Sequence, residues 1–137
     1  MLHPGPAEGV RQLEPARAAA DDDDRVLAGW VRLGVLDGRR YLTAESVRMM
    51  STVQTGDLVT GFTPGNGWGL GVCIVRQPQG VTELLSPGTF GHGGAYGTQV
   101  WIDMKRGVAL IMMIQRSNFK NGDDSPARLA FQKAALE

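Results

Sequence analysis

The feature that most constrains the fold is Val108–Ile114, an apolar run near the C-terminus without a single polar or charged side chain. A run of this length, rich in β-branched and long aliphatic residues, predicts a strand that is buried on both faces and therefore lies inside a sheet. Thr98–Ile102 precedes it with a similar pattern, and Asp103–Gly107 between them is typical of a hairpin turn. The sequence thus predicts an antiparallel pair at the centre of a sheet.

Two further strands are expected before this pair. Trp68–Val75 alternates bulky residues with glycine, as a strand with close backbone neighbours does, and Val81–Leu85 favours a short strand after a turn near Gln77–Gly80. A turn is also predicted at Leu36–Arg39, which contains the turn-favouring pair Asp37-Gly38.

Three helices are expected around these strands. The first follows Asp21–Asp24, carries an apolar stripe and ends at Gly34; its stripe consists of Val26, Leu27, Trp30, Val31 and Leu33. The second has Thr43 as its cap and runs over 44–53, with Val47, Met50 and Val53 facing inward. The last helix runs over 127–136; Ser125 supplies its capping hydroxyl and Pro126 is its first-turn proline.

The fold class is therefore α+β: about four antiparallel strands, two N-terminal helices and one C-terminal helix. Residues 1–20 contain three prolines and almost no apolar periodicity, which predicts a disordered leader, and residues 21–137 are expected to form the domain.

Composition excludes several classes of partner. The 14 basic and 14 acidic side chains balance, which gives no electrostatic reason to expect nucleic acid or an anionic membrane as partner. No stretch approaches the ~20 apolar residues of a membrane span, and the N-terminus lacks the apolar run of a secretory signal, so a cytoplasmic location is expected. Cys73, the single cysteine, sits in an apolar run and is expected to pack as a small hydrophobe.

The segment Thr89–Gly97 is the strongest candidate for chemistry, because a short apolar strand runs into His92 and is followed at once by glycines. Taken alone, the pattern also fits a bulged turn with His92 merely exposed. Neither this segment nor 65–71 has the spacing of a phosphate-binding loop. His3 and His92 are the only histidines, which argues against a metal site, and no cofactor is expected.

A resemblance to a known family joins these features. Phe90–Asp103 resembles the third conserved motif of the penicillin-recognising serine hydrolases, the class C β-lactamase and esterase type, in which Lys-Thr-Gly, His-Thr-Gly, His-Gly-Gly or Trp-Gly-Gly precedes a strand. Leu36–Met50 resembles the family's upstream helix pair, and Gly67–Val72 its glycine-rich strand. Met104 departs from the family's proline after Asp103. The resemblance covers roughly residues 25–136.

The resemblance implies a partial β-lactamase/transpeptidase-like fold, the C-terminal part of such a domain, and one wall of an acyl-transfer site. Ala95 would supply a backbone N–H of the oxyanion hole, and His92 would line the pocket with Gly93, Gly94 and Tyr96. The family's Ser-x-x-Lys and Tyr-x-Asn motifs are absent upstream of His92. Ser117-Asn118-Phe119-Lys120 spells the first motif but follows the apolar strand, where the family's nucleophile does not lie.

A truncated or split serine hydrolase is therefore the leading hypothesis, inactive alone and acting on a small ester or amide only with a complementing N-terminal fragment. An imidazole is mostly neutral at pH 7, where the family's lysine is charged, and this favours an esterase or amide hydrolase as parent over a β-lactamase. Two alternatives stay open: a non-enzymatic binding module that retains the half-fold, and a half-enzyme that uses a separate N-terminal chain. The expected exposed strand edges also allow self-association.

Overall fold

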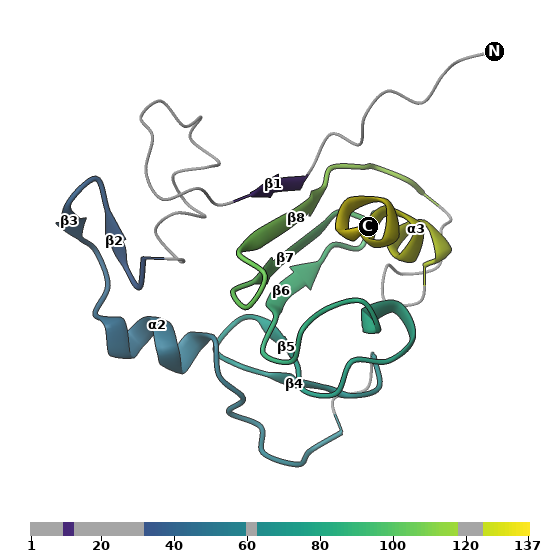
Figure 1. Cartoon of the computed structure of the whole chain (residues 1–137). Coiled ribbons are helices and arrows are strands. Elements are labelled where there is room, and N and C mark those ends of the chain that lie inside the picture. The colour runs from purple at the N-terminus through teal and green to yellow at the C-terminus, as the bar shows by residue number, and fades with distance from the viewer. Residues whose placement is uncertain (1–9, 13–31, 60–62, 118–124) are drawn as a thin grey trace.

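The computed structural model describes residues 10–12, 32–59, 63–117 and 125–137 (Figure 1). Its main element is a six-stranded antiparallel sheet with the order β1-β8-β7-β6-β5-β4. The strands are β1 (Val10–Gln12), β4 (Asn66–Trp68), β5 (Cys73–Val75), β6 (Phe90–Gly93), β7 (Gln99–Asp103) and β8 (Val108–Met112). A separate hairpin pairs β2 (Val35–Leu36) with β3 (Arg39–Arg40), and the helices are α2 (Ala44–Met50), α3 (Pro126–Leu136) and the 3-10 turn η1 (Gly80–Thr82).

The predicted central hairpin is confirmed. β7 and β8 pair antiparallel with Trp101 opposite Leu110 and Ile102 opposite Ala109. All four of these residues are at most 5 % exposed, so both faces of the pair are buried, as the apolar pattern requires. The predicted turn between them is also present, and the strand entering the histidine segment forms β6.

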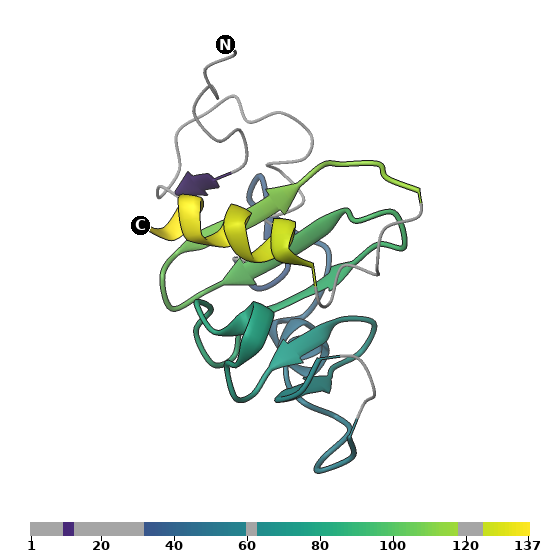
Figure 2. The same cartoon turned by 90° about the vertical axis from the view of Figure 1, so that its right-hand side faces the viewer.

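The two faces of the sheet are covered by different elements. α3 lies across one face, and Figure 2 shows it in front of β6, β7 and β8 with α2 on the far side. Under α3, in what we call the α3 face, Val75, Leu85, Trp101 and Leu110 form one apolar cluster. On the opposite face, the open face, a second cluster contains Ile74, Phe90, Ile102 and Ala109.

Two of the strand predictions are wrong in detail. Trp68–Val75 is not one strand but a hairpin, because the chain reverses at Leu70–Gly71, where Gly71 has φ +83°. Val81–Leu85 is not a strand, because the η1 turn occupies its start. There Thr82 Oγ1 donates to Gln79 O at 2.9 Å and accepts from Gln79 N at 3.1 Å, which closes the turn.

The second predicted helix is present but shorter than expected. Thr43 is its N-cap, accepting a hydrogen bond from Ser46 N at 3.0 Å. α2 ends at Met50 rather than at Val53, because Ser51 Oγ donates to Val47 O at 2.9 Å and Thr52 Oγ1 donates to Arg48 O at 2.9 Å. These side chains satisfy the terminal carbonyls that another helical turn would have used.

The last helix is confirmed as α3, with Pro126 in its first turn. The predicted cap is wrong, since the Ser125 hydroxyl is buried and makes no cap hydrogen bond. No helix in the described ranges has the length and hydropathy needed to cross a membrane.

The fold contains one N-terminal helix in its described residues, α2, rather than the expected two. Most of the helix expected before Gly34 falls on 21–31, outside the described residues, and Arg32 and Leu33 lie in a turn. Of the expected leader, the structure describes only Val10–Gln12, which pair with β8 as a strand that the sequence did not predict.

Asp103 joins two loops at the end of β7. Its buried carboxylate accepts hydrogen bonds from Ser86 N at 3.0 Å, Lys105 N at 3.1 Å and Arg106 N at 3.0 Å. Burial alone would raise the pKa of Asp103, but the hydrogen bonds from Ser86 and Arg106 outweigh it and hold the pKa below its ordinary value. The carboxylate therefore fixes the β7–β8 turn against the loop that follows η1.

Candidate functional site

The residues predicted to form the site lie together where β6 turns into β7. His92 pairs with Val100 and Gly93 with Gln99, which places this turn at the end of the sheet opposite Asp103. Phe90, two residues before His92, belongs to the open-face cluster, so the alternation of side chains places His92 on the open face. Gly93 faces the opposite side. A Cβ on Gly93 would come within 2.7 Å of Gln99 Nε2, and Gln99 shares its side of β7 with Trp101, which belongs to the α3-face cluster.

The glycine at position 94 lies close against the Thr98 side chain. A Cβ there would stand 2.1 Å from Thr98 Oγ1, across a turn in which Gly94 N donates to Thr98 O at 2.7 Å. The sequence argument offered two reasons for side-chain-free positions, a neighbouring backbone or an approaching substrate. At Gly94 it is the Thr98 side chain that fills the space, whereas at Gly91 the structure supplies the first reason, since a Cβ there would meet the backbone oxygen of Val100 at 1.9 Å.

Ala95 occupies the second position of a β-turn. Gly97 N donates to Gly94 O at 3.0 Å and closes the turn around Ala95 and Tyr96. None of the described residues accepts a hydrogen bond from the Ala95 N–H, and the residue is exposed. This amide can therefore donate to a bound molecule without breaking a bond of the fold.

His92 is exposed, and two neighbours limit its ring. Its Nδ1 contacts Gly93 O in a short hydrogen bond. The ring of Trp68 packs against it edge to face, with centroids 5.2 Å apart and planes inclined at 62°. The structure thus places His92 beside the free amide of Ala95 along the chain and orients its imidazole from β4.

Tyr96 is 59 % exposed at the tip of the same turn. Its backbone carbonyl accepts a hydrogen bond from Arg116 N at 3.0 Å, which attaches the turn to the segment after β8. All five predicted residues, from His92 to Tyr96, are therefore contiguous and accessible or half-buried.

Trp68 is the site residue that the sequence argument missed. It stands in the Gly67–Val72 segment that the resemblance singled out, but nothing in one sequence indicates which strands become neighbours. β4 is separated from β6 by β5 in the sheet, yet the Trp68 ring reaches His92. The useful signal was the large aromatic between two glycines, where no neighbouring side chain crowds it.

Within the described ranges, no group of three or more His, Cys, Asp and Glu side chains could hold a metal ion. Cys73 is half-buried and packs against the α3-face cluster, so its predicted role as a small hydrophobe agrees with its packing.

Comparison with known proteins gives a family match. The family model described as Beta-lactamase matches residues 6–135. Protein Rv1367c of Mycobacterium tuberculosis (strain H37Rv) is 35 % identical over 108 residues, which cover 72 % of this chain and 27 % of that protein. An uncharacterized protein of a second strain of that species, CDC 1551, matches equally well. The chain thus spans about a quarter of the length of these relatives.

Solved structures agree in fold. A β-lactamase from Mycobacterium bovis superposes with a TM-score of 0.62 at 27 % identity, covering 81 % of this chain and 40 % of that one. EstCE1, a hydrolase with promiscuous acyltransferase activity, gives a TM-score of 0.57 over 85 % of this chain and 29 % of that one. Its 20 % identity shows a shared fold alone. The described elements therefore form part of a larger fold in these proteins.

Proposed function

This chain belongs to the β-lactamase family, and on that premise we propose that it forms one wall of an acyl-transfer site in a serine hydrolase whose nucleophile lies outside these 137 residues. The substrate would be a small ester or amide. The observation that carries the proposal is the free N–H of Ala95, exposed in a turn closed by other hydrogen bonds and adjacent to the exposed His92 segment.

The chemistry follows from what such an amide can do. A serine oxygen attacks the carbonyl carbon and its proton passes to a neighbouring base. The carbonyl oxygen becomes an oxyanion, and the Ala95 N–H stabilises it by a hydrogen bond. When the tetrahedral intermediate collapses, the alcohol or amine leaves with a proton, and water later releases the acid. The only Ser-x-x-Lys in this sequence, at Ser117, stands after β8 and so follows the site along the chain, whereas the family's nucleophile precedes it.

His92 bears on the substrate class. A neutral imidazole attracts the carboxylate of a β-lactam less than a lysine does, and this supports neutral esters or amides as substrates. Tyr96, exposed at the tip of the turn, would offer an aromatic surface to such a substrate.

Complementation tests the proposal. The chain is expected to show no hydrolysis of a chromogenic short-chain ester or a chromogenic cephalosporin by itself. Mixed with an N-terminal fragment of a full-length relative that contains Ser-x-x-Lys and Tyr-x-Asn, it is expected to gain esterase activity. The partner should also stabilise the chain, because it binds only the folded form. Turnover by the isolated chain that disappears in Ser117→Ala would contradict the placement of the nucleophile.

Two substitutions locate the oxyanion contact in the active complex. Ala95→Pro removes the N–H at the second position of a β-turn, a position where proline is favoured, so the variant should fold. Loss of one oxyanion donor costs about 100- to 1,000-fold in kcat. Ala95→Gly keeps the N–H and serves as the matched control, with nearly unchanged activity expected.

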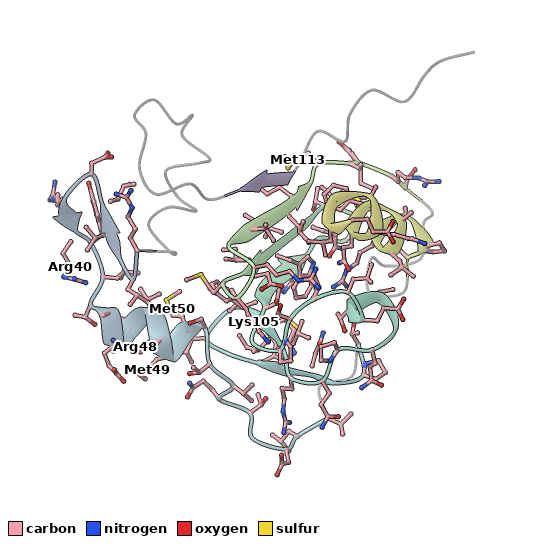
Figure 3. The ribbon with its side chains drawn as sticks, viewed as in Figure 1. Arg40, Arg48, Met49, Met50, Lys105 and Met113 are labelled. Atoms are coloured by element: carbon pink, nitrogen blue, oxygen red, sulfur yellow. The ribbon has the colours of Figure 1, made fainter. Side chains whose placement is uncertain are left out.

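His92→Ala should lower kcat/KM by roughly 10- to 100-fold, which corresponds to about 1.4–2.7 kcal/mol. Lys105→Gln is its control, since Lys105 (labelled in Figure 3) lies in the turn beyond the far end of β7. An active complex in which Ala95→Pro and His92→Ala both behave like wild type would show that this wall is not part of the site. A stable complex without turnover would favour the binding-module alternative.

A further inference from the structure

The hydrogen bond between His92 and Gly93 defines where the imidazole carries its proton. The contact joins His92 Nδ1 to the carbonyl oxygen of Gly93. A backbone carbonyl can only accept, so Nδ1 must be the donor in this pair. In the neutral ring the second nitrogen, Nε2, is then unprotonated and carries a lone pair.

Nε2 is also accessible. His92 is exposed, and among the described residues no partner takes up a hydrogen bond with Nε2. An exposed histidine would ordinarily sample several rotamers, which would spread its lone pair over many directions. The Trp68 ring restricts that freedom, because its centroid lies 5.2 Å from that of the imidazole in an edge-to-face arrangement.

We infer that His92 is held as the Nδ1–H tautomer and presents Nε2 as a hydrogen-bond acceptor, with Trp68 as the positioning residue that orients the ring. The class of ligand that fits is a molecule with an O–H or N–H donor, such as a phenol, an alcohol or a primary amide. A carboxylate fits poorly, because its oxygens and the unprotonated Nε2 are all hydrogen-bond acceptors and none can donate to another. The identification of this ligand as a substrate rests on the proposed function, whereas the tautomer and the orientation of the ring are independent of it.

The position of Trp68 explains how an exposed contact can persist. Trp68 N donates to Thr55 Oγ1 at 3.1 Å, and Trp68 O accepts from Gln54 N at 2.7 Å. The segment after α2 thus holds the backbone of Trp68 on the side of β4 that faces away from the other strands. The fold therefore sets the position of the Trp68 backbone independently of His92, and the Trp68 ring is half-buried.

Nuclear magnetic resonance of the ring nitrogens tests the inference on the full chain. At alkaline pH, where imidazoles are neutral, long-range ¹⁵N–¹H correlation spectra distinguish a protonated from an unprotonated nitrogen. His3 is the only other histidine, so His3→Gln assigns the two signals. We expect Nδ1 of His92 to be protonated and Nε2 unprotonated. A spectrum dominated by the Nε2–H form would overturn the inference.

Variants of Trp68 separate positioning from a general structural role. Trp68→Ala should abolish the preference for Nδ1–H, giving a mixed population, while Trp68→Phe, which keeps an aromatic edge, should retain it. Amide spectra of both variants report whether the sheet is intact. If Trp68→Ala leaves the tautomer unchanged in a folded protein, Trp68 does not position His92.

The ability of His92 Nε2 to accept a hydrogen bond is tested with phenol as the probe. Anisole, which lacks the hydroxyl, is its matched control. Phenol should shift the Nε2 resonance saturably and more than anisole does at equal concentration. Equal shifts would rule out the acceptor role. Because these measurements need no turnover, they can fail while complementation succeeds, or succeed while it fails, so the two proposals are tested separately.

Discussion

The α3 face of the sheet is covered by a helix that adds the partly buried Phe131, Ala135 and Leu136 to its cluster, whereas the partly buried side chains around the open-face cluster come from strands and loops. Under α3, Val75 and Leu110 are 0 % exposed, and the guanidinium of the fully buried Arg128 lies 4.3 Å from the Trp101 ring centroid. On the open face, the buried cluster is flanked by partly buried Val53, Val72, Val100 and Ile111.

Several polar side chains on the α3 face hydrogen-bond to other groups of the protein. On the α3 face Trp101 Nε1 donates to Gln99 Oε1 at 2.9 Å. Gln132, with its amide oriented to suit both neighbours, donates to Val81 O at 2.8 Å and accepts from Arg128 Nε at 3.0 Å. Where β6 turns into β7, the Ala95 N–H and His92 Nε2 have no hydrogen-bond partner among the described residues.

This difference suggests a division of labour. The α3 face has the more completely buried apolar cluster and so contributes most to stability, although Gln99 Nε2 on this face has no partner among the described residues. The segment that carries His92 instead leaves a donor and an acceptor for a bound molecule. Sites need unsatisfied groups that the rest of the fold can hold in place. The comparison therefore predicts large stability effects on one face and small ones on the other.

The largest effect is expected from Trp101→Ala. Removing this 2 %-exposed ring leaves a cavity and takes away the surface on which Arg128 stacks, so the free energy of unfolding should fall by about 3–5 kcal/mol. Ile111→Ala on the open face is the control and should cost only about 1–2 kcal/mol, because a half-buried side chain loses less transfer free energy. Urea denaturation measures both. Equal losses would show that the open face is packed as tightly as the α3 face.

An intermediate effect is expected at Asp103. Asp103→Asn places an amide against N–H donors and should lower the free energy of unfolding at pH 7 by about 1–3 kcal/mol. The folded pKa of Asp103 lies below its unfolded value of about 3.9, so the contribution is complete above pH ~4 and is lost as pH falls through the folded pKa. The difference between wild type and variant should therefore shrink in urea titrations below pH ~4. A constant difference would mean that the carboxylate charge does not matter.

The smallest effect is expected at His92. His92→Ala removes an exposed side chain from the open face, so the free energy of unfolding should change by no more than about 0.5 kcal/mol. Thermal or urea denaturation of this variant beside wild type checks it. A loss above about 2 kcal/mol would identify His92 as a structural residue and remove the division between the faces.

The local features of the fold were predictable from short stretches of sequence. The uninterrupted apolar run predicted β8, Asp103–Gly107 predicted the turn before it, and Thr43 marked the start of α2. Each depends on neighbours within a few residues, where the period of side-chain polarity or a capping hydroxyl is sufficient.

Two of the wrong predictions, the strand at Val81–Leu85 and the length of α2, share a different cause. η1 replaced a strand because Thr82 bonds back to Gln79, and α2 stopped early because Ser51 and Thr52 bond to its last carbonyls. Such side-chain bonds to the local backbone compete with regular structure, and propensity does not anticipate which competitor wins.

By itself the sequence determined the family, the central hairpin and the segment His92–Tyr96 as the candidate wall, because these are encoded in contiguous residues. Only the tertiary structure decided that Trp68 meets His92 and that the backbone of Val100 leaves no room for a side chain at Gly91. It also decided that Asp103 fixes a loop from elsewhere in the chain. Each of these contacts joins residues through strand order and register, which are set by which faces can be buried together across the whole sheet.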